Sequence, residues 1–152
     1  MPDTLRFCRE LTTIHLARNA LTGPLLQFLE DFEFLNGLYL NRNQFTGNLL
    51  SFANNLHLRN LDLSDNQISG TIPVDFLQSV DKVSFGTLNL GSNKISGSIP
   101  PVLAGNTHLQ LENNLITSID SAIYNKDLEG DIAEFGADAI LCPPSKYNSI
   151  NR

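Results

Sequence analysis

One phrase of eight residues occurs five times between residues 14 and 116. In each copy two apolar residues stand two positions apart, an asparagine follows three residues after the second, and another apolar residue ends the phrase. The asparagines are Asn19, Asn43, Asn66, Asn93 and Asn114, at intervals of 24, 23, 27 and 21 residues. Repeats of this length are typical of a solenoid, in which each turn contacts only its neighbours. The function of such a chain is therefore expected on a surface rather than in a pocket.

Each phrase indicates a short strand followed by a turn. Alternation of apolar and other residues directs two side chains of each copy inward, and stacked copies form a parallel sheet. The asparagine stands where the chain leaves the sheet, so its amide can bond backbone groups of its own turn and the next. We interpret the five asparagines as a structural ladder rather than as catalytic groups, because buried polar groups need partners.

Glycine follows the asparagine by four residues in four copies, at Gly23, Gly47, Gly70 and Gly97. Glycine permits a sharp bend or a positive φ. After it we expect an extended segment with one inward residue, namely Leu25, Leu49, Ile72 and Ile99. The return legs are too short for long helices, which predicts 3-10 or single helical turns. Their expected inward residues are Phe28, Phe32, Leu35, Phe52, Leu56, Leu58, Phe76, Val80, Val83, Val102 and Leu103.

These features resemble the leucine-rich repeat family, in the plant-type subclass with the pattern Leu-x-x-Leu-x-Leu-x-x-Asn-x-Leu-x-Gly-x-Ile-Pro. The resemblance covers residues 8–119, and residues 58–73 fit the pattern without exception. It implies an α/β repeat solenoid with a concave parallel sheet, a short second sheet at the Gly-x-Ile-Pro segments, and 3-10 or irregular return legs. It also implies recognition of another protein or peptide, as in receptor ectodomains and inhibitors of cell-wall-degrading enzymes.

We divide the chain into five leucine-rich repeats over residues 1–119, the first incomplete at its N-terminal side, and a C-terminal capping segment over residues 120–152. The fifth repeat is short and has Ser118 where glycine is expected, and the long step before the fourth predicts a small bulge at Asp81-Lys82. Residues 120–138 carry a net charge of −5 without the carboxylate spacing of a calcium loop, so we interpret them as a solvated surface. The apolar residues available to cover the end of the core are Ile132, Phe135, Ala139, Ile140 and Leu141.

The two cysteines lie at opposite ends of the chain. By its offset from Asn19, Cys8 is expected at an inward position of a return leg. Four steps of roughly 4.8 Å separate it from Cys142 by roughly 20 Å, whereas a disulfide needs Cα atoms within about 7 Å, so the two should not be bonded. The segment Cys142-Pro143-Pro144 resembles the opening of cysteine-rich modules in some algal surface proteins. With a start inside a repeat, this favours a piece of a longer protein, extracellular or at the cell surface.

Nothing in the sequence points to catalysis, a cofactor or a metal. The three histidines fall in different turns, and neither a phosphate-binding loop nor a nucleophile elbow is present. A net charge of −6 disfavours nucleic acid as a partner. No apolar run reaches the length of about 18 residues that suggests a transmembrane helix. We therefore expect a binding protein rather than an enzyme.

The candidate binding surface is the outward side of the five strands. Three positions of each repeat are expected there, and the predicted partner-binding residues among them are His15, Arg18, Tyr39, Asn41, Arg42, Asp62, Asp65, Asn89, Gln110 and Glu112. A solvated sheet face explains polar residues equally well one by one. The richest cluster is Tyr39 with His15, Arg18 and Arg42, because tyrosine and arginine are typical anchors and an arginine pair favours carboxylates.

Three other functions remain open at this stage. The chain can be a structural accessory subunit that docks by its convex side or its cap, or an inhibitor of a secreted hydrolase. Ice binding by a flat repeated face would be expected to show an array of threonines, and the three outward positions contain none. The first two repeats are expected to matter most if a partner docks on the strands.

Overall fold

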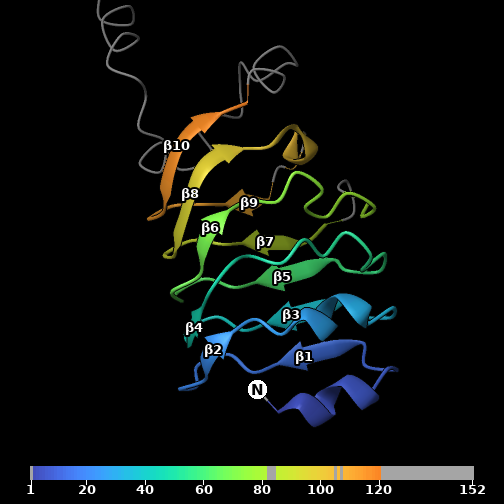
Figure 1. Cartoon of the computed structure of the whole chain (residues 1–152). Coiled ribbons are helices and arrows are strands. Elements are labelled where there is room, and N and C mark those ends of the chain that lie inside the picture. Colours follow the sequence, from blue (N-terminus) through green and yellow to red (C-terminus); the bar gives the residue numbers. More distant parts are fainter. Residues whose placement is uncertain (1, 82–84, 105, 107, 121–152) are drawn as a thin grey trace, which may run out of the picture.

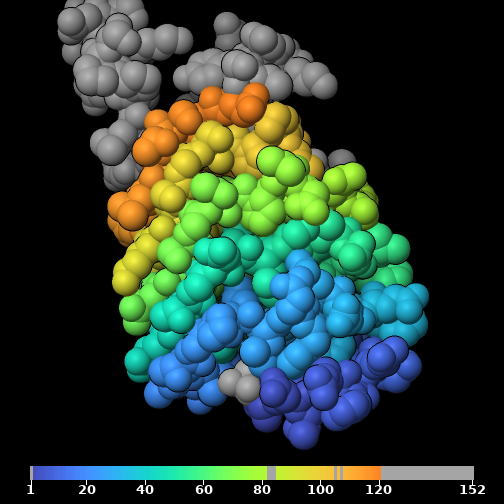
Figure 2. All heavy atoms as spheres, viewed as in Figure 1, coloured from blue at the N-terminus to red at the C-terminus, as the bar shows by residue number. Residues whose placement is uncertain are grey.

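A computed structural model describes residues 2–81, 85–104, 106 and 108–120. These residues form a coil of stacked turns, seen in Figure 2 as successive bands along the molecule. Each turn contributes one strand to a five-stranded sheet (Figure 1), formed by β1 (Thr13–His15), β3 (Gly37–Tyr39), β5 (Asn60–Asp62), β7 (Thr87–Asn89) and β9 (Leu109–Gln110). The strands are parallel and lie in chain order. The prediction of a strand in each of the five phrases is confirmed.

The strand register places equivalent residues of the five phrases side by side. Ile14 pairs with Leu38, Leu38 with Leu61, Leu61 with Leu88, and Leu88 with Leu109. All five are buried and belong to one hydrophobic core that runs the length of the coil. Because side chains alternate along a strand, the residues on either side of each point outward.

A second row of strands follows the asparagines along another side of the coil (Figure 1). It consists of β2 (Thr22–Pro24) with β4 (Gln44–Thr46), and of β6 (Ser69–Thr71), β8 (Lys94–Ile99) and β10 (Leu115–Ile119). The bridge between Asn48 and Ser69 joins the two groups. The glycines at the bend have φ of 88°, 78°, 80° and 81°, as the sequence suggested, and the expected inward residues after them are buried.

The fifth turn departs from this row where glycine is missing. Ser118 is not among the residues with positive φ, and the pairing of β10 with β8 shifts register between Ile116 and Ser118. A serine does not adopt the left-handed backbone as readily as glycine does, so the strand accommodates an extra residue at Thr117 instead.

The return legs contain the 3-10 helices η1 (Asp3–Phe7), η2 (Gln27–Asp31) and η4 (Pro101–Leu103), as expected. Most of the apolar residues assigned to the legs are buried, and the rings of Phe52 and Phe76 pack edge to face at 6.4 Å. One assignment is wrong, because Leu56 is 56 % exposed. Phe28 and Val102 are half-buried and pack against the core.

A buried polar residue that the sequence did not single out explains why Leu56 is exposed. Asn55 is fully buried beside Leu56, and its Nδ2 donates to the carbonyl oxygens of Leu29 and Phe32 at 3.0 and 3.1 Å. The leg therefore turns Asn55 inward and Leu56 outward. In η2, Leu29 has no exposed surface, and the ring of Phe28 lies edge to face with the ring of Phe32 at 5.9 Å while lining a cleft.

Cys8 does not occupy an inward position. It is exposed, and it follows η1 as the residue whose N–H caps this helix on the carbonyl of Leu5. None of the residues of η1 is buried, so the offset that places Phe32 inside in the next turn does not transfer to Cys8. Cys142, Lys82, Val83 and the residues proposed for the cap lie outside the described residues.

The asparagine ladder is confirmed in its four later members. Asn66 Nδ2 donates to the carbonyl oxygens of Leu40, Leu63 and Ser64 at 3.0–3.1 Å, and its Oδ1 accepts from the N–H of Phe45 at 3.0 Å. Asn43, Asn93 and Asn114 repeat this pattern. The bonded neighbour is the preceding turn. Asn19 is exposed, and among the described residues its Nδ2 bonds only the carbonyl oxygens of Leu16 and Ala17 in its own turn.

Candidate binding surface

Four columns of outward side chains cross the five-stranded sheet, and together we call them the strand face. The strand register and the equivalent turn positions define them. The first column contains Thr13, Gly37, Asn60, Thr87 and His108, and the second contains His15, Tyr39, Asp62, Asn89 and Gln110. The third column contains Ala17, Asn41, Ser64, Gly91 and Glu112, and the last contains Arg18, Arg42, Asp65, Ser92 and Asn113.

The last column has a left-handed backbone in every turn. The φ angles of Arg18, Arg42, Asp65, Ser92 and Asn113 lie between 52° and 59°. Asparagine and aspartate tolerate this conformation better than other residues, whereas it costs a residue such as arginine about 1–2 kcal/mol. The backbone therefore gives no reason for arginine at this position in the first two turns.

His15 and Tyr39 form an aromatic pair across the first two turns. Their ring centroids are 5.2 Å apart, with an angle of 35° between the ring planes. Gly37 makes room for the tyrosine, because a Cβ at this glycine would lie 2.9 Å from Tyr39 Cε2. Tyr39 is half-buried and His15 is exposed, so the pair is accessible to solvent.

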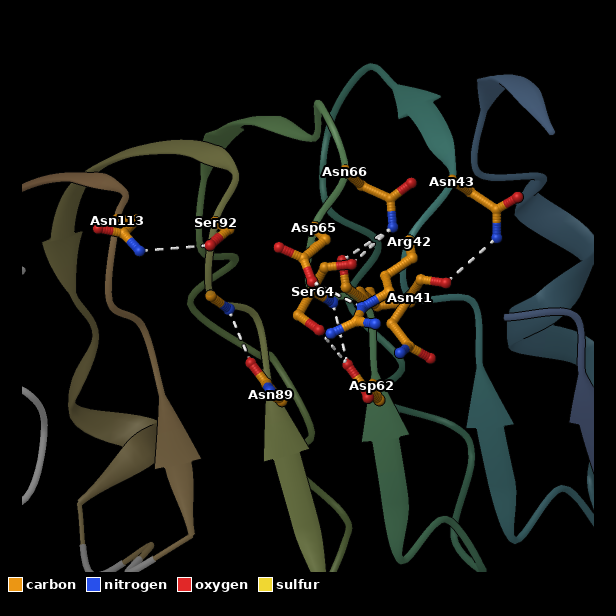
Figure 3. Close-up of polar contacts among 12 residues, drawn as sticks. Asn41, Arg42, Asn43, Asp62, Ser64, Asp65, Asn66, Asn89, Ser92 and Asn113 are labelled. Carbon is orange, nitrogen blue, oxygen red and sulfur yellow. Dashed lines mark hydrogen bonds and ion pairs between the residues drawn. The ribbon is translucent and has the colours of Figure 1, made fainter. Parts of the chain in front are cut away.

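The two arginines of the predicted cluster differ in their contacts. Arg42 Nε lies 3.4 Å from Asp65 Oδ2 of the next turn, and the two side chains are 56 % and 47 % exposed (Figure 3). An exposed pair of this kind contributes about 0.2–1 kcal/mol. The side chain of Arg18 has no hydrogen bond or ion pair within the described residues. Of the predicted cluster, the structure thus joins His15 to Tyr39 and turns Arg42 toward Asp65.

In the third and fourth turns the outward polar residues bond their own backbone. Asp62 Oδ1 accepts from the N–H and the Oγ of Ser64 at 3.1 and 2.7 Å, and Asn89 Oδ1 accepts from the N–H of Gly91 at 2.9 Å (Figure 3). Such contacts stabilise the turn that follows each strand. These side chains therefore have a structural role whether or not a partner binds them.

The remaining predicted residues lie at the far end and in the second turn. The carboxylate of Glu112 leans over Gly91, where any Cβ would collide with it. Gln110 is exposed and Asn41 is half-buried. Asn113 Nδ2 donates to Ser92 Oγ at 3.3 Å, which links the last two turns at the rim of the strand face.

Comparison with known proteins identifies the family. The sequence profile described as Leucine Rich Repeat matches residues 57–79 and 85–106. Solved plant receptor ectodomains of this type superpose on most of the chain. The chain is a plant-type leucine-rich repeat protein. No curated protein sequence matches it significantly.

Three solved leucine-rich repeat structures illustrate the similarity. The plant peptide hormone receptor RGFR1 in complex with RGF2 has 32 % sequence identity and a TM-score of 0.69 over 77 % of this chain. The ectodomain of GASSHO1/SCHENGEN3 from Arabidopsis thaliana, in complex with CASPARIAN STRIP INTEGRITY FACTOR 2, has 29 % identity and a TM-score of 0.67 over 77 % of the chain. The chain spans only 19 % and 14 % of these two structures. For the BIR3–SERK2 complex from Arabidopsis thaliana the values are 28 % and 0.64, over 86 % of this chain and 70 % of the other.

The sequence prediction missed the first column of the strand face in these repeats. The alternation that predicts the outward columns also extends one residue upstream of the first inward residue of each strand. Gly37 is the important omission, because its missing side chain positions Tyr39. The left-handed backbone of the last column was also missed, and the recurrence of Asp and Asn next to the ladder was the available signal.

The repeats offer few features typical of other kinds of site. Within the described ranges no three His, Cys, Asp or Glu side chains are placed to hold a metal ion, and no helix there has the length and apolarity to cross a membrane. A cleft of about 460 Å³ lies between η1 and η2, lined by Phe7 and Phe28 together with Arg6, Arg9 and other residues. It lies away from the strand face.

Proposed function

We propose that this leucine-rich repeat protein is a non-catalytic recognition module of the extracellular space or cell surface, and that it binds a protein or peptide through its strand face. The observation that carries the proposal is the difference between the repeats of that face. In the first two repeats, side chains suited to binding make few contacts with their own protein. In the third and fourth, the outward side chains bond the backbone.

The chemistry of the first two repeats favours an aromatic and carboxylate-bearing partner. Tyr39, whose ring is tilted against that of His15, offers a large apolar surface with a hydroxyl at its end. Arg18 and Arg42 flank it on the rim and supply planar donors that match carboxylates. The ion pair with Asp65 is exposed, so a partner carboxylate can replace it at a small energetic cost.

The related structures support a binding role. RGFR1 and GASSHO1/SCHENGEN3 are described in complexes with RGF2 and CASPARIAN STRIP INTEGRITY FACTOR 2, and BIR3 with SERK2. These complexes make a peptide or a second protein the natural kinds of partner to seek. Because the chain spans a small part of the two receptors, the identity of the partner does not transfer from them.

The decisive experiment is to capture partners from the native source and to map the complex by hydrogen–deuterium exchange. The proposal predicts protection of residues 13–18 and 37–42, with little change on the return legs. A captured hydrolase that loses activity on stoichiometric mixing would identify the chain as an inhibitor acting through the same face.

The accessory-subunit alternative predicts another footprint. Phe34, Leu56 and Val74 are large apolar residues exposed on the return legs, and the ring of Phe34 stacks on His57 at 6.2 Å. Protection confined to these legs would contradict the proposed function and would favour an accessory subunit that docks by its return legs.

A further inference from the structure

The strand face carries opposite charges at its two ends. Among its described residues, the charged side chains of the first two repeats are Arg18 and Arg42, and both are exposed. In the third to fifth repeats they are Asp62, Asp65 and Glu112, and no lysine or arginine stands in the columns there. Histidines occur at both ends and do not distinguish them. The only Arg or Lys beside these later columns within the described sheet is Arg59, which precedes β5 at the sheet edge.

The acidic end is built to accept hydrogen bonds from a ligand. Asp62 Oδ1 accepts hydrogen bonds from Ser64, whereas Asp62 Oδ2 has no hydrogen bond among the described residues. Over Gly91, the carboxylate of Glu112 converges with Asn89 Oδ1, which would lie 3.1 Å from a Cβ at that glycine. These oxygens form an acceptor strip over repeats three to five. Its chemical complement is an ammonium or guanidinium group.

We propose that the strand face binds an extended peptide of mixed charge in one direction, with an acidic segment on repeats one and two and a basic segment over repeats three to five. This inference rests on the proposed function and adds the charge pattern and direction of the ligand. A polyanion such as nucleic acid would meet Asp62, Asp65 and Glu112 over half of its path. A peptide carries both charges in a fixed order and avoids this repulsion.

The spacing of the repeats sets the length of such a ligand. Neighbouring parallel strands lie about 4.8 Å apart, so the first repeat is roughly 10 Å from the third and roughly 20 Å from the fifth. An extended peptide advances about 3.3 Å per residue, which corresponds to roughly three to six residues between the opposite charges. Tyr39 and Asn41 lie in the second repeat close to Arg42 in the sequence, and suit uncharged residues next to the acidic segment of the peptide.

The test uses the complete chain and a synthetic eight-residue peptide with blocked ends. The peptide carries two aspartates at one end, four Gly, Ser or Tyr residues in the middle and two arginines at the other end. Comparison peptides replace one charged pair so that both ends are acidic or both are basic. At low salt the mixed-charge peptide should bind about tenfold more tightly than either comparison peptide in fluorescence anisotropy.

Direction is read from photo-crosslinkers placed at either end of the mixed-charge peptide. A crosslinker at the aspartates should label residues 13–18 and 37–42, and one at the arginines should label residues 60–65, 87–92 and 108–113. Equal binding of a single-charge peptide, or labelling of the same repeats from both ends, would overturn the inference.

Charge-neutralising double variants test each end of the strand face, and matched double variants away from it serve as controls. Arg18→Gln with Arg42→Gln, and Asp62→Asn with Glu112→Gln, should each weaken binding about fivefold, because each removes two complementary charges. The amide of Asp62→Asn keeps an oxygen for Ser64, so the turn is retained. Arg6→Gln with Arg9→Gln, and Asp31→Asn with Glu33→Gln, change the net charge equally away from the strand face and should leave binding within about twofold.

The outcome for the proposed function is separate. If the native partner protects the strand face but the peptides show no charge preference, only this inference fails. If the native partner leaves the strand face unprotected, the proposed function fails whatever the peptides do.

Discussion

The first and third repeats contain the same phrase, yet its polar residues make different contacts in the two places. In the third repeat Asn66 is buried and bonds three carbonyl groups and one N–H, while Asp62 and Asp65 contact Ser64 and Arg42. In the first repeat Asn19 is exposed and bonds two carbonyls of its own turn. The outward side chains there contact no backbone group in the described part of the chain.

This difference follows from the position of each repeat in the stack. An interior turn has a preceding turn whose backbone groups need partners, and its ladder asparagine supplies them. Within the described coil, the first repeat has neighbouring strands on one side only. Stability is therefore concentrated in the interior repeats, and the first repeat, which belongs to the proposed binding surface, has the least engaged polar groups. The predictions below test this separation, from the largest effect to the smallest.

Asn66→Ala should lower the free energy of unfolding by about 3–5 kcal/mol, because it removes several buried hydrogen bonds and leaves the N–H of Phe45 without an acceptor. Asn19→Ala, the matched change in the first repeat, should cost less than about 1 kcal/mol since its site is exposed. Urea unfolding followed by circular dichroism measures both values. Equal losses would show that the two repeats contribute alike.

Gly70→Ala and Gly37→Ala should have opposite consequences. Gly70 has φ of 80° and close contact with Asn48, so alanine there should reduce stability by about 1–3 kcal/mol without changing partner affinity. Gly37 lacks a positive φ, and alanine there displaces the Tyr39 ring instead. Its main effect should be weaker binding, measured by isothermal titration calorimetry with the captured partner. Loss of stability without loss of affinity for Gly37→Ala would contradict the assigned role.

Asp62→Ala should reduce stability by about 1 kcal/mol, since the N–H and hydroxyl of Ser64 lose their acceptor. His15→Ala, at the same column of the first repeat, should change stability by less than about 0.5 kcal/mol because its side chain is exposed. Thermal unfolding of the two variants under identical conditions compares them. A larger loss for His15→Ala would reverse the assignment of structural and binding roles.

The ion pair between Arg42 and Asp65 should contribute the least. A double-mutant cycle with Arg42→Ala and Asp65→Ala should give a coupling energy of about 0.2–1 kcal/mol that falls as salt is added. A coupling energy well above this range would mean that Arg42 is held for structural reasons and is not available to a partner.

The sequence predicted the coil well because its repeats depend on local requirements. Inward leucines, ladder asparagines and bend glycines each satisfy a condition that recurs in every turn, so their spacing alone identified them. The return legs were less predictable. Leu56, expected inside, is exposed, and the neighbouring Asn55 is buried because its amide bonds two carbonyls of the preceding turn, a contact between turns that spacing does not encode.

The outward face shows a second limit of the same kind. Its columns could be predicted from alternation, but not the contacts within them. The position of the Tyr39 ring beside His15 depends on the missing side chain of Gly37. The contact of Arg42 with Asp65 joins two turns that both have a left-handed backbone one residue before the asparagine. These are effects of three-dimensional neighbours.

The central claim is that the partner binds the strand face in the first two repeats, and one matched pair of variants tests it directly. Tyr39 and Phe34 are near each other in the sequence and each ring lies beside a histidine ring, but Tyr39 lies on the strand face and Phe34 on the return leg. Measured by calorimetry with the native partner, Tyr39→Ala should weaken affinity about tenfold or more, and Phe34→Ala by less than about twofold. Unchanged affinity for Tyr39→Ala together with a large loss for Phe34→Ala would contradict the account.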